Sequence, residues 1–401
     1  MDKALAGLTV LDLSRVLAGP YGTMVLGDFG AEIIKVEQPG RGDDTRQWGP
    51  PFSPGGQSAY FLSVNRNKRS ITLNLKSVEG RAILRRLADQ ADVLIENFKV
   101  GTMDGLGLGY AQLRESNPGL IYCSITGYGQ TGPYKDRPGY DTVIQAQGGL
   151  MSITGPTEDG SDGQPFKVGV AIVDVSAGLF AVIGILAALH HRQRTGQGQA
   201  IDIALFDAQL GWLANVASNY LVSGQPPQRY GNAHATIVPY QTFATADGHL
   251  MLAVGNDGQF RALCGVLGVD GLADDPCFAT NPARVQNRET LVPLLAEQFR
   301  RQPTHAWIER LLDVDVPCGP VDDVPTALSN PQAQARGMVQ QVVDSAGDAI
   351  SLVGPVIKMS GTPPAIASAP PHLGEQTEEI LREKLGLGTE EIGELRRAGV
   401  V

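Results

Sequence analysis

An aspartate between two apolar segments is the residue best placed for chemistry in this sequence of 401 residues. Asp174 follows the apolar run 168–173 and precedes the apolar stretch 175–189, which has the composition of a buried helix. Its carboxylate is therefore expected near a helix N-terminus, where backbone N–H groups and the helix dipole favour the ionised form. Such a carboxylate is a usable nucleophile, but aspartate is also among the commonest helix caps. Taken alone, the residue favours a plain cap, with a nucleophile as the alternative.

Other residue patterns with a chemical interpretation are weaker. The basic cluster Arg66-Asn67-Lys68-Arg69 indicates either an anion-binding site or a solvated surface. No Walker A loop, G-x-S-x-G elbow or HExxH motif occurs in the sequence. The four cysteines are far apart and form no CxxC pair. We therefore expect no metal site and no disulfide framework.

Composition and charge exclude several classes of protein. A net charge of −10 argues against a nucleic-acid surface, which needs an excess of Lys and Arg. The stretch 175–189 is shorter than the roughly 20 residues that cross a bilayer. The first ten residues enter a strand pattern without the features of a signal peptide. These observations predict a cytoplasmic protein with no nucleic-acid and no membrane partner.

The elements that must position these residues alternate between strand and helix patterns. Helical patterns at 19–29, 78–90 and 206–221 separate short apolar runs. Such alternation predicts an α/β fold, in which a mostly parallel, Rossmann-like sheet is covered by helices on both faces and binds ligands beyond the carboxyl ends of its strands. The strand candidates are 8–13, 31–37, 70–75, 91–96, 120–125 and 199–204.

The length of the chain favours two domains. We expect a large Rossmann-like domain at 1–222 and a linker at 223–240, where periodicity is lost and Gly and Pro accumulate. A smaller α+β domain at 241–325 begins with a hairpin. The remainder, 326–401, returns to the large domain.

The sequence resembles the class III CoA-transferases along nearly its whole length. The resemblance is carried by LDLSRVLAGPYGTMVLGDFGAEIIKVEQPGRGDDTR, NRNKRSITLNLK, ENFKVGTMDGLGLGY, YCSITGYGQTGPYKDRPGYD and KVGVAIVDVSAGLFAVIGILAAL. This group contains formyl-CoA:oxalate CoA-transferase, carnitine CoA-transferase and the alpha-methylacyl-CoA racemases, and the chain is most similar to the succinate:hydroxymethylglutarate CoA-transferase branch. The resemblance implies an interlocked homodimer, an acyl-CoA and a free carboxylic acid as substrates, and no prosthetic group.

The resemblance also implies roles for particular residues. Asp174, in GVAIVDV, matches the catalytic aspartate, which makes the nucleophile the preferred interpretation, and Tyr140 matches a residue near the thioester. A mobile glycine loop that closes over the acyl group matches Gly255, Asn256, Asp257, Gly258 and Gln259. The implied contacts to coenzyme A are Val16, Leu17, Ala18, Leu73, Asn74, Leu75, Lys76, Asn97, Phe98, Lys99, Arg137, Pro138, Gly139 and Asp141.

The chain departs from the formyl-CoA enzyme at two arginine positions, which are Gln38 and Gly105 here. Part of the usual phosphate grip is therefore absent, and Lys99, Arg137 or the basic cluster 66–69 could replace it. We expect succinyl-CoA as donor and a small dicarboxylate such as hydroxymethylglutarate, glutarate or itaconate as acceptor. The remote carboxylate of that acceptor would need a cation, for which Arg137, Arg229 and a protonated His234 are candidates. His234 is equally well interpreted as a linker residue.

The expected mechanism is a double displacement at Asp174 through an aspartyl anhydride and an aspartyl-CoA thioester. Backbone N–H groups near 255–258, or at the start of the helix that carries Asp174, would stabilise the oxyanions. Two alternatives remain. One is a 2-methylacyl-CoA racemase, although Tyr140 stands where that branch has a histidine. The other is a CoA-binding protein without catalytic activity.

Overall fold

The computed structural model describes residues 3–157 and 163–401 and divides into two compact units. The first unit contains Met1–Gly149, Val168–Asn215 and Pro331–Val401. The second contains Leu150–Lys167 and Val216–Asn330. The segment 150–167 thus belongs to the second unit although the chain on both sides of it belongs to the first.

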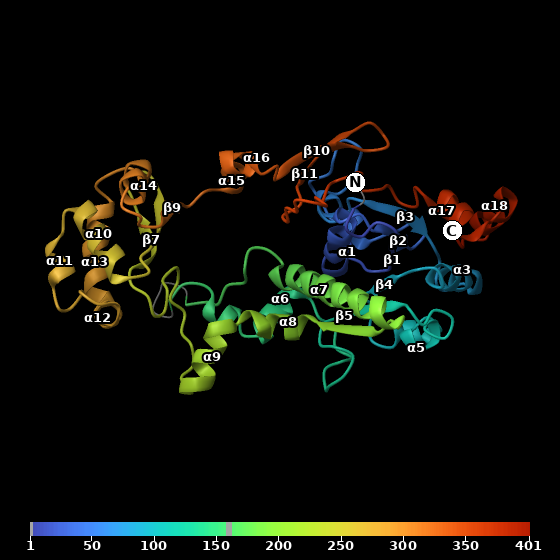
Figure 1. Ribbon diagram of the computed structural model, residues 1–401, viewed down its shortest axis with the longest axis horizontal. Coiled ribbons are helices and arrows are strands. Elements are labelled where there is room, and N and C mark those ends of the chain that lie inside the picture. Colours follow the sequence, from blue (N-terminus) through green and yellow to red (C-terminus); the bar gives the residue numbers. More distant parts are fainter. Residues whose placement is uncertain (1–2, 158–162) are drawn as a thin grey trace. The chain divides into compact units, whose positions relative to one another are not determined.

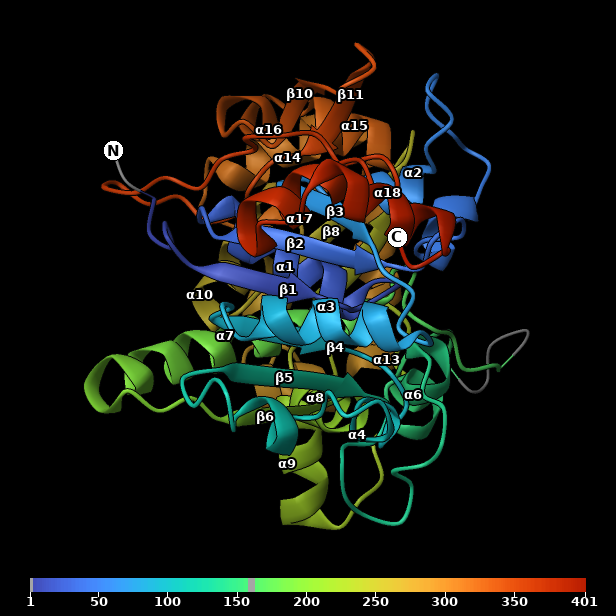
Figure 2. The ribbon, with the colours of Figure 1, turned by 90° about the vertical axis from the view of Figure 1, so that its right-hand side faces the viewer.

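A six-stranded, fully parallel sheet forms the centre of the first unit (Figure 1). Its strand order is β3-β2-β1-β4-β5-β6, and Figure 2 shows the strands one above another in this order. The order of strand addition reverses between β1 and β4, which is the place where doubly wound folds bind ligands. The strands are β1 (Thr9–Asp12), β2 (Glu32–Glu37), β3 (Lys68–Thr72), β4 (Val93–Glu96), β5 (Ile121–Thr126) and β6 (Ala200–Ala204).

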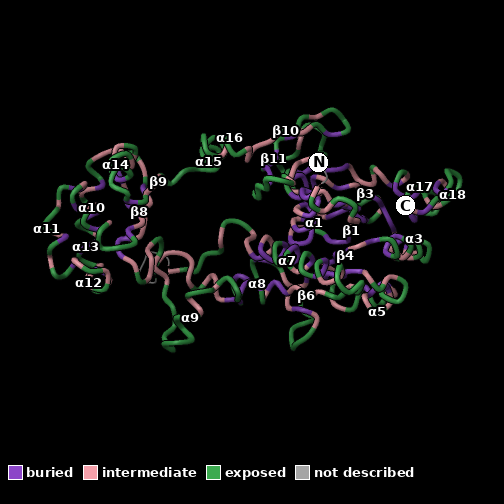
Figure 3. The backbone as a smooth tube through the Cα atoms, viewed as in Figure 1, coloured by how far each residue is buried: buried purple, intermediate pink, exposed green. Residues whose placement is uncertain are grey.

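Helices cover both faces of this sheet. On one face, α1 (Ala18–Asp28) and α7 (Ile172–Thr195) enclose a core that includes Val10, Ile95 and Ile121. On the other face, α3 (Val78–Ala88), α17 (Thr377–Leu385) and α18 (Thr389–Arg397) enclose a second core. Because the central strands are buried on both sides, they are nearly continuous apolar runs, and β1 and β4 are largely purple in Figure 3.

The helices α1 and α7 cross at very short distance because both have glycine at the crossing. A Cβ atom on Gly178 would lie 2.4 Å from the carbonyl oxygen of Ala18, and one on Gly22 would lie 2.9 Å from the carbonyl oxygen of Gly178. No side chain fits between the two backbones. The crossing therefore fixes the beginning of α1 beside the second turn of α7.

The helix α7 is longer than the sequence pattern indicated. It has 24 residues, and its length and composition alone would allow it to cross a membrane. Half of its most apolar stretch of 18 residues is buried within the chain, and the core helix of a soluble protein can have the same length and composition. Its outer face still exposes large apolar side chains, namely Leu179, Phe180, Ile183 and Leu186.

Shorter elements complete the first unit. The chain returns from the second unit through a small antiparallel hairpin that packs near α2. These elements are η1 (Asp44–Gln47), α2 (Ala59–Ser63), α4 (Thr102–Gly105), α5 (Tyr110–Leu113), α6 (Asp141–Gln147), α8 (Leu205–Trp212), α16 (Pro331–Ala335), β10 (Val339–Val343) and β11 (Ala349–Val353).

The second unit is a small α+β assembly with its own core. A three-stranded antiparallel sheet, in the order β7-β8-β9, packs against helices around Phe243, Phe299 and Trp307. Its elements are η2 (Met151–Ile153), β7 (Tyr240–Ala244), β8 (His249–Ala253), α10 (Asp257–Leu267), α11 (Gly271–Asp274), α12 (Asn281–Gln286), α13 (Arg288–Phe299), α14 (Thr304–Leu312), β9 (Cys318–Pro320) and α15 (Val324–Ser329).

The predicted α/β class and the six parallel strands are confirmed. The single helix expected at 206–221 is wrong, because the chain forms α8 and then α9 (Ala214–Ser223). Ala214 has a φ of 37°, which no continuous right-handed helix contains. Apolar periodicity could not show this break, since it continues across it.

Candidate active site

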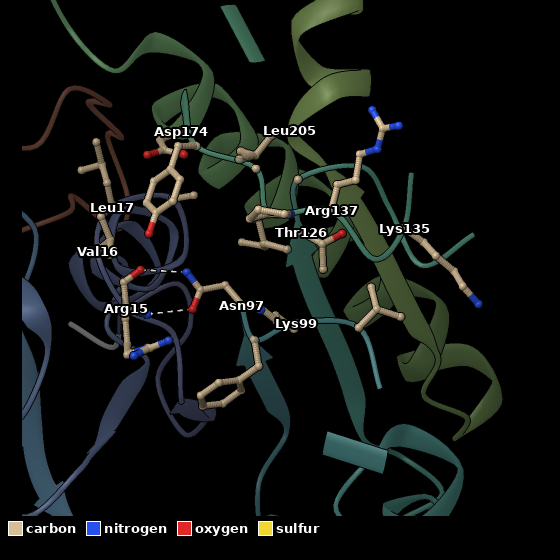
Figure 4. A pocket seen from close by; sticks show the side chains of 18 of the residues that line it. Arg15, Val16, Leu17, Asn97, Lys99, Thr126, Lys135, Arg137, Asp174 and Leu205 are labelled. Carbon is tan, nitrogen blue, oxygen red and sulfur yellow. Dashed lines mark hydrogen bonds between the residues drawn. The ribbon is translucent and has the colours of Figure 1, made fainter. Parts of the chain in front are cut away.

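A pocket of about 240 Å³ lies at the carboxyl ends of β1, β4 and β5 in the first unit. The loops after these strands and the segment 135–140 form its walls, and Asp174 contributes from α7 (Figure 4). A Cβ atom on Gly139 would lie 2.3 Å from the Cα atom of Gly127, so paired glycines let that segment pack on the end of β5. The pocket is lined by Arg15, Val16, Leu17, Ala18, Asn97, Phe98, Lys99, Val100, Ile125, Thr126, Gly127, Lys135, Asp136, Arg137, Pro138, Gly139, Tyr140, Asp174 and Leu205.

Asp174 is the third residue of α7 and does not cap the helix. The cap is supplied by Asp141, whose Oδ2 accepts hydrogen bonds from the backbone N–H groups of Val173 (2.8 Å) and Asp174 (3.2 Å). The interpretation of Asp174 as a plain cap is therefore wrong. Its carboxylate takes no part in capping the helix, and the residue lines the pocket.

Asp141 is held by its own partners and does not line the pocket. Gln145 donates to its Oδ1 at 2.5 Å, and the amide oxygen of Gln145 accepts from the backbone of Val168 at 2.9 Å. The side chain of Asp141 is buried. In this structure the Asp141 carboxylate anchors the start of α7, and the contact to coenzyme A that the resemblance implied for this residue stays a prediction.

The environment of Asp174 opposes ionisation. Burial raises the pKa of Asp174 to about 7, and the neighbouring carboxylate of Asp141 adds to the rise. Within residues 3–157 and 163–401, no hydrogen-bond donor or cation offsets these effects at the Asp174 carboxylate. The expected preference for the ionised form is thus wrong, because Asp141 uses the helix N–H groups and the carboxylate lies in a partly closed pocket.

Two tyrosines lie near this carboxylate. Tyr140 lines the pocket, immediately precedes α6, and is 66% exposed. Tyr60, from α2, was not identified from the sequence. Burial raises the pKa of Tyr60 to about 12, and the charges of Asp174, Asp141 and Asp43 contribute to the rise. Its hydroxyl therefore stays protonated and is electrostatically coupled to Asp174, and its position within YFLS offered no periodic or motif signal.

The loop between β1 and α1 is clamped from two sides. The side-chain amide of Asn97 accepts from the backbone N–H of Arg15 at 2.9 Å and donates to its carbonyl at 2.8 Å (Figure 4). The carboxylate of Asp43 accepts from the backbone N–H of Val16, at 3.2 Å to each oxygen. Asn97 thus lies at the pocket, as expected, and its side chain is committed to shaping the loop.

Val16 needs this support because its φ is 71°, in the left-handed region. A β-branched residue there costs on the order of 1–3 kcal/mol. A hydrogen bond to a charged acceptor contributes about 1.5–3 kcal/mol, which is enough to offset that cost. Neither Asp43 nor the unusual conformation of Val16 was foreseen from the sequence.

The other implied CoA contacts gather around an adjoining cavity of about 190 Å³. Leu73, Asn74, Leu75 and Lys76 line it, and Phe98 borders both cavities. Arg41 also lines this second cavity and pairs with Asp44 at 2.7 Å, while Arg15, which borders both cavities, pairs with the same carboxylate at 3.4 Å. Neither arginine was identified from the sequence.

The basic cluster 66–69 is not an anion site. Arg66 and Lys68 are buried, and they pair with Asp28 (2.6 Å) and Asp12 (3.0 Å), respectively. Arg69 pairs with Glu32, Glu379 and Glu383. Both interpretations of this cluster are wrong, since its charges stabilise the sheet and reach neither cavity.

Of the expected oxyanion donors, those at the start of α7 and the first one of the segment 255–258 are already occupied. The N–H groups of Val173 and Asp174 donate to Asp141, and the N–H of Gly255 donates to the side chain of Gln259 at 2.8 Å. The start of α1 provides an alternative. In the described parts of the chain, nothing accepts from the N–H groups of Leu17 and Ala18, and both residues line the pocket.

The remaining predicted site residues belong to the second unit. Gly255 and Asn256 precede α10, and Asn256 caps this helix by accepting from the N–H of Gln259 at 2.9 Å. Asp257 pairs with Arg284 at 2.8 Å, and Gly258 is in the first turn of the helix. The expected glycine loop is thus a capped helix start.

The two other cations considered for the acceptor are also in the second unit. His234 accepts from the backbone N–H of Thr236 at 3.1 Å and packs against the ring of Tyr240. Arg229 donates to the carbonyl groups of Pro156 and Gly163. In the first unit, Arg137 lies over the ring of Tyr134 at 3.7 Å, and Lys135 extends from the same segment (Figure 4).

A six-stranded parallel sheet with a carboxylate nucleophile candidate at its switch point is consistent with the expected class III CoA-transferase. Comparison with known proteins agrees. Residues 5–377 match the model of "CoA-transferase family III". The chain belongs to this family.

Curated relatives cover the chain almost completely. It is 45% identical to human "Succinyl-CoA:glutarate CoA-transferase" over 399 residues, which is 100% of this chain and 90% of the relative. It is 48% identical to "Succinate--glutarate CoA-transferase" of Agrobacterium fabrum, over 94% of this chain and 95% of the relative. Among solved structures, a CAIB/BAIF family protein from Brucella suis is 47% identical, with a TM-score of 0.85, over 96% of this chain and 100% of that one.

Proposed function

We propose that this protein transfers coenzyme A from succinyl-CoA to a small dicarboxylic acid, with Asp174 as the nucleophile. The observation that carries the proposal is a carboxylate that lines the pocket at the β1/β4 switch point without a hydrogen-bond donor among the described residues. With a pKa of about 7, a substantial fraction of it is ionised at neutral pH. The succinyl-CoA and glutarate named for the relatives support the choice of donor and acceptor.

The reaction needs only carboxylates and thioesters. The Asp174 carboxylate attacks the thioester carbonyl carbon, and the C–S bond breaks to give a mixed anhydride and CoA thiolate. The thiolate then attacks the aspartyl carbonyl carbon, which forms an aspartyl-CoA thioester and releases the donor as a free carboxylate. The acceptor carboxylate attacks that thioester and expels the thiolate, and the thiolate attacks the acceptor carbonyl of the new anhydride. The product leaves as an acyl-CoA and Asp174 is regenerated.

Each attack places negative charge on a carbonyl oxygen close to the pocket wall. We assign the stabilisation of this charge to the N–H groups of Leu17 and Ala18, which begin α1, belong to residues that line the pocket and have no acceptor among the described residues. Loss of one such donor typically lowers the rate about 10² to 10³-fold.

The adjoining cavity is the proposed site for the nucleotide end of coenzyme A. Arg15, Arg41 and Lys76 supply positive charge there, which a chain of net charge −10 otherwise lacks. Asp44 pairs with both arginines, and a phosphate group would compete with it for them. These cations take the place of the arginines that the formyl-CoA enzyme has at Gln38 and Gly105.

A homodimer is part of the proposal. The apolar outer face of α7, with Leu179, Phe180, Ile183 and Leu186, is exposed in the single chain and has the character of a surface that a second copy covers.

Replacement of Asp174 by alanine or asparagine tests the mechanism. We expect CoA transfer to fall by at least about 10⁴-fold while acyl-CoA still binds, because the covalent route is lost. Hydroxylamine added during turnover should convert Asp174 of the wild-type enzyme to a hydroxamate that peptide mass spectrometry detects. The exposed residue Asp207 on α8 provides the matched control, Asp207→Asn, which should keep wild-type activity. Wild-type transfer by Asp174→Ala would refute the proposal.

A further inference from the structure

We propose that Asp43 is a positioning residue for the transfer reaction, because its buried carboxylate holds Val16 in a left-handed conformation and so directs the N–H groups of Leu17 and Ala18 into the Asp174 pocket. This inference rests on the proposed function, since it gives Asp43 a part in that reaction. Asp43 acts through the loop and not by contact with the reacting atoms.

The backbone of Val16 is held in a conformation that it would not adopt alone. Its φ of 71° is an outlier for a β-branched residue, and such a conformation persists only where surrounding contacts enforce it. The N–H of Val16 lies 3.2 Å from both carboxylate oxygens of Asp43. Because φ is the rotation about the N–Cα bond of Val16, this hydrogen bond fixes the peptide plane relative to which the torsion directs the following residues. The hydrogen bond and the strained torsion therefore act together on the chain after Val16.

The residues directly after Val16 begin the helix α1. Leu17 is the residue that precedes α1, and Ala18 is the first residue of the helix. The torsion at Val16 therefore sets the direction in which the first N–H groups of α1 point. These are the groups that the described residues leave without an acceptor.

Asp43 is itself rigidly held. The residue is 1% exposed, and its Oδ1 also accepts from the N–H (3.0 Å) and hydroxyl (2.8 Å) of Thr45. The fully buried Lys35 donates to its Oδ2 at 3.0 Å and to the carbonyl of Ser14 at 3.0 Å. One ammonium thus ties the carboxylate to the beginning of the same loop. These bonds anchor Asp43 to buried groups, among them Lys35 of β2. The sheet therefore fixes the position of Asp43, and through it that of Val16.

The other clamp on the loop does not duplicate this one. Asn97 holds only the backbone of Arg15, which precedes Val16 (Figure 4). In the described structure, Asp43 is the only side chain bonded to the N–H of Val16. The torsion that carries the strain is therefore controlled from Asp43.

A double-mutant cycle between Asp43→Asn and Val16→Gly tests the inference. The asparagine keeps the shape of the side chain but loses its charge, so we expect kcat to fall about 10 to 100-fold, with the KM for succinyl-CoA changed less than about threefold. Glycine adopts a positive φ without strain. Val16→Gly alone should cost only a few-fold in kcat, and in the Asp43→Asn background it should restore kcat at least about fivefold.

The matched control is Thr23→Val, which removes a hydroxyl bonded at 2.7 Å to Asp12, another buried carboxylate of the same sheet end. It should lower thermal stability, and Val16→Gly should not improve any kinetic constant of this variant. If Asp43→Asn does not fold, Thr45→Val replaces it, because that change loosens Asp43 but keeps its charge. A few-fold loss of kcat that Val16→Gly recovers is then the expected result.

Two results would overturn the inference: a folded Asp43→Asn enzyme with wild-type kcat, or strictly additive losses in the cycle. Failure of the proposed function is recognised separately. If Asp174→Asn still transfers CoA, the mechanism itself is wrong. If Asp174→Asn is inactive and the cycle is additive, only the role of Asp43 is lost.

Discussion

Asp141 acts on Asp174 in two opposite ways. Through hydrogen bonds, it fixes the backbone at the start of α7 and so holds the nucleophile in place. Through space, its negative charge adds to the effect of burial and raises the pKa of Asp174 to about 7. A carboxylate that is costly to ionise is a better nucleophile and a better acyl carrier than a well-solvated one. The same pair therefore supplies both geometry and reactivity.

This pair predicts a pH dependence. Since only the ionised Asp174 attacks, and its pKa is raised, kcat/KM should rise with pH through a midpoint near 7 and be lost below it. Asp141→Asn removes the adjacent charge but keeps an oxygen for the helix N–H groups, so its midpoint should move to lower pH. Tyr60, with a pKa of about 12, stays neutral over this range. The profile should change most between about pH 5 and 8, the range in which the Asp174 carboxyl titrates. A profile that is flat over this range, or one that Asp141→Asn does not shift, would contradict this account.

From the position of Arg41 we predict that this residue binds the 3′-phosphate and so makes the enzyme prefer CoA over 3′-dephospho-CoA. It lines the adjoining cavity and is held there by Asp44 at 2.7 Å. A charge-assisted contact to phosphate contributes about 1.5–3 kcal/mol, so Arg41→Ala should reduce the preference for CoA over 3′-dephospho-CoA by about tenfold or more. Arg261, an exposed arginine paired with Asp274 in the second unit, is the control. Equal preference in Arg41→Ala and Arg261→Ala would place the phosphate elsewhere.

At the scale of elements, the site depends on where α1 and α7 begin. Gly178 lies one helical turn after Asp174, and a Cβ atom there would be 2.4 Å from the carbonyl of Ala18. We expect Gly178→Ala to cost about 1–3 kcal/mol of stability and to lower activity, because both helix starts must shift. Gly211 in α8 has open space at its Cβ position, so Gly211→Ala should keep activity and raise stability by about 0.5–1 kcal/mol. Calorimetry and the transfer assay measure both effects, and unchanged melting of Gly178→Ala would disprove the tight crossing.

The elements were predictable from the sequence where one-dimensional pattern determines them. The apolar runs that became β1 and β4 are buried on both faces, so their composition alone identified them. The long apolar helix expected after Asp174 is also present, although it begins at Ile172 and so already includes the end of the apolar run 168–173.

The features that the sequence did not reveal depend on pairing over long separations. Lys68 was interpreted as exposed or anion-binding, yet its partner Asp12 lies 56 residues earlier, on a strand brought near only by the sheet. Asp141 caps a helix that begins 31 residues later, and Asp43 supports a loop 27 residues earlier. Side-chain periodicity carries no information about such partners, so the charges that shape the site could be assigned only from the fold.

At the scale of the whole molecule, the outer face of α7 exposes a group of large apolar side chains to water in the single chain. The face combines Leu179, Phe180, Ile183 and Leu186, and Ile183 is 61% exposed. Burial of one such side chain contributes about 1.5–3 kcal/mol, and an aspartate in its place would carry a charge into the same contact. A second copy of the chain is the occupant that we propose for this face.

The substitution Ile183→Asp tests this assembly. We expect the wild-type protein to have the mass of a dimer in size-exclusion chromatography with light scattering, and the variant to shift toward the monomer at low micromolar concentration, because one charge would be buried in each half of the interface. Leu312→Asp, at a 52% exposed apolar position on α14, is the matched control and should leave the mass unchanged. A monomeric wild type would refute the dimer, and a fully dimeric Ile183→Asp would place the interface on another surface. Flotation of the wild type with liposomes would instead show that this face of α7 meets a membrane, the other environment that its length and composition permit.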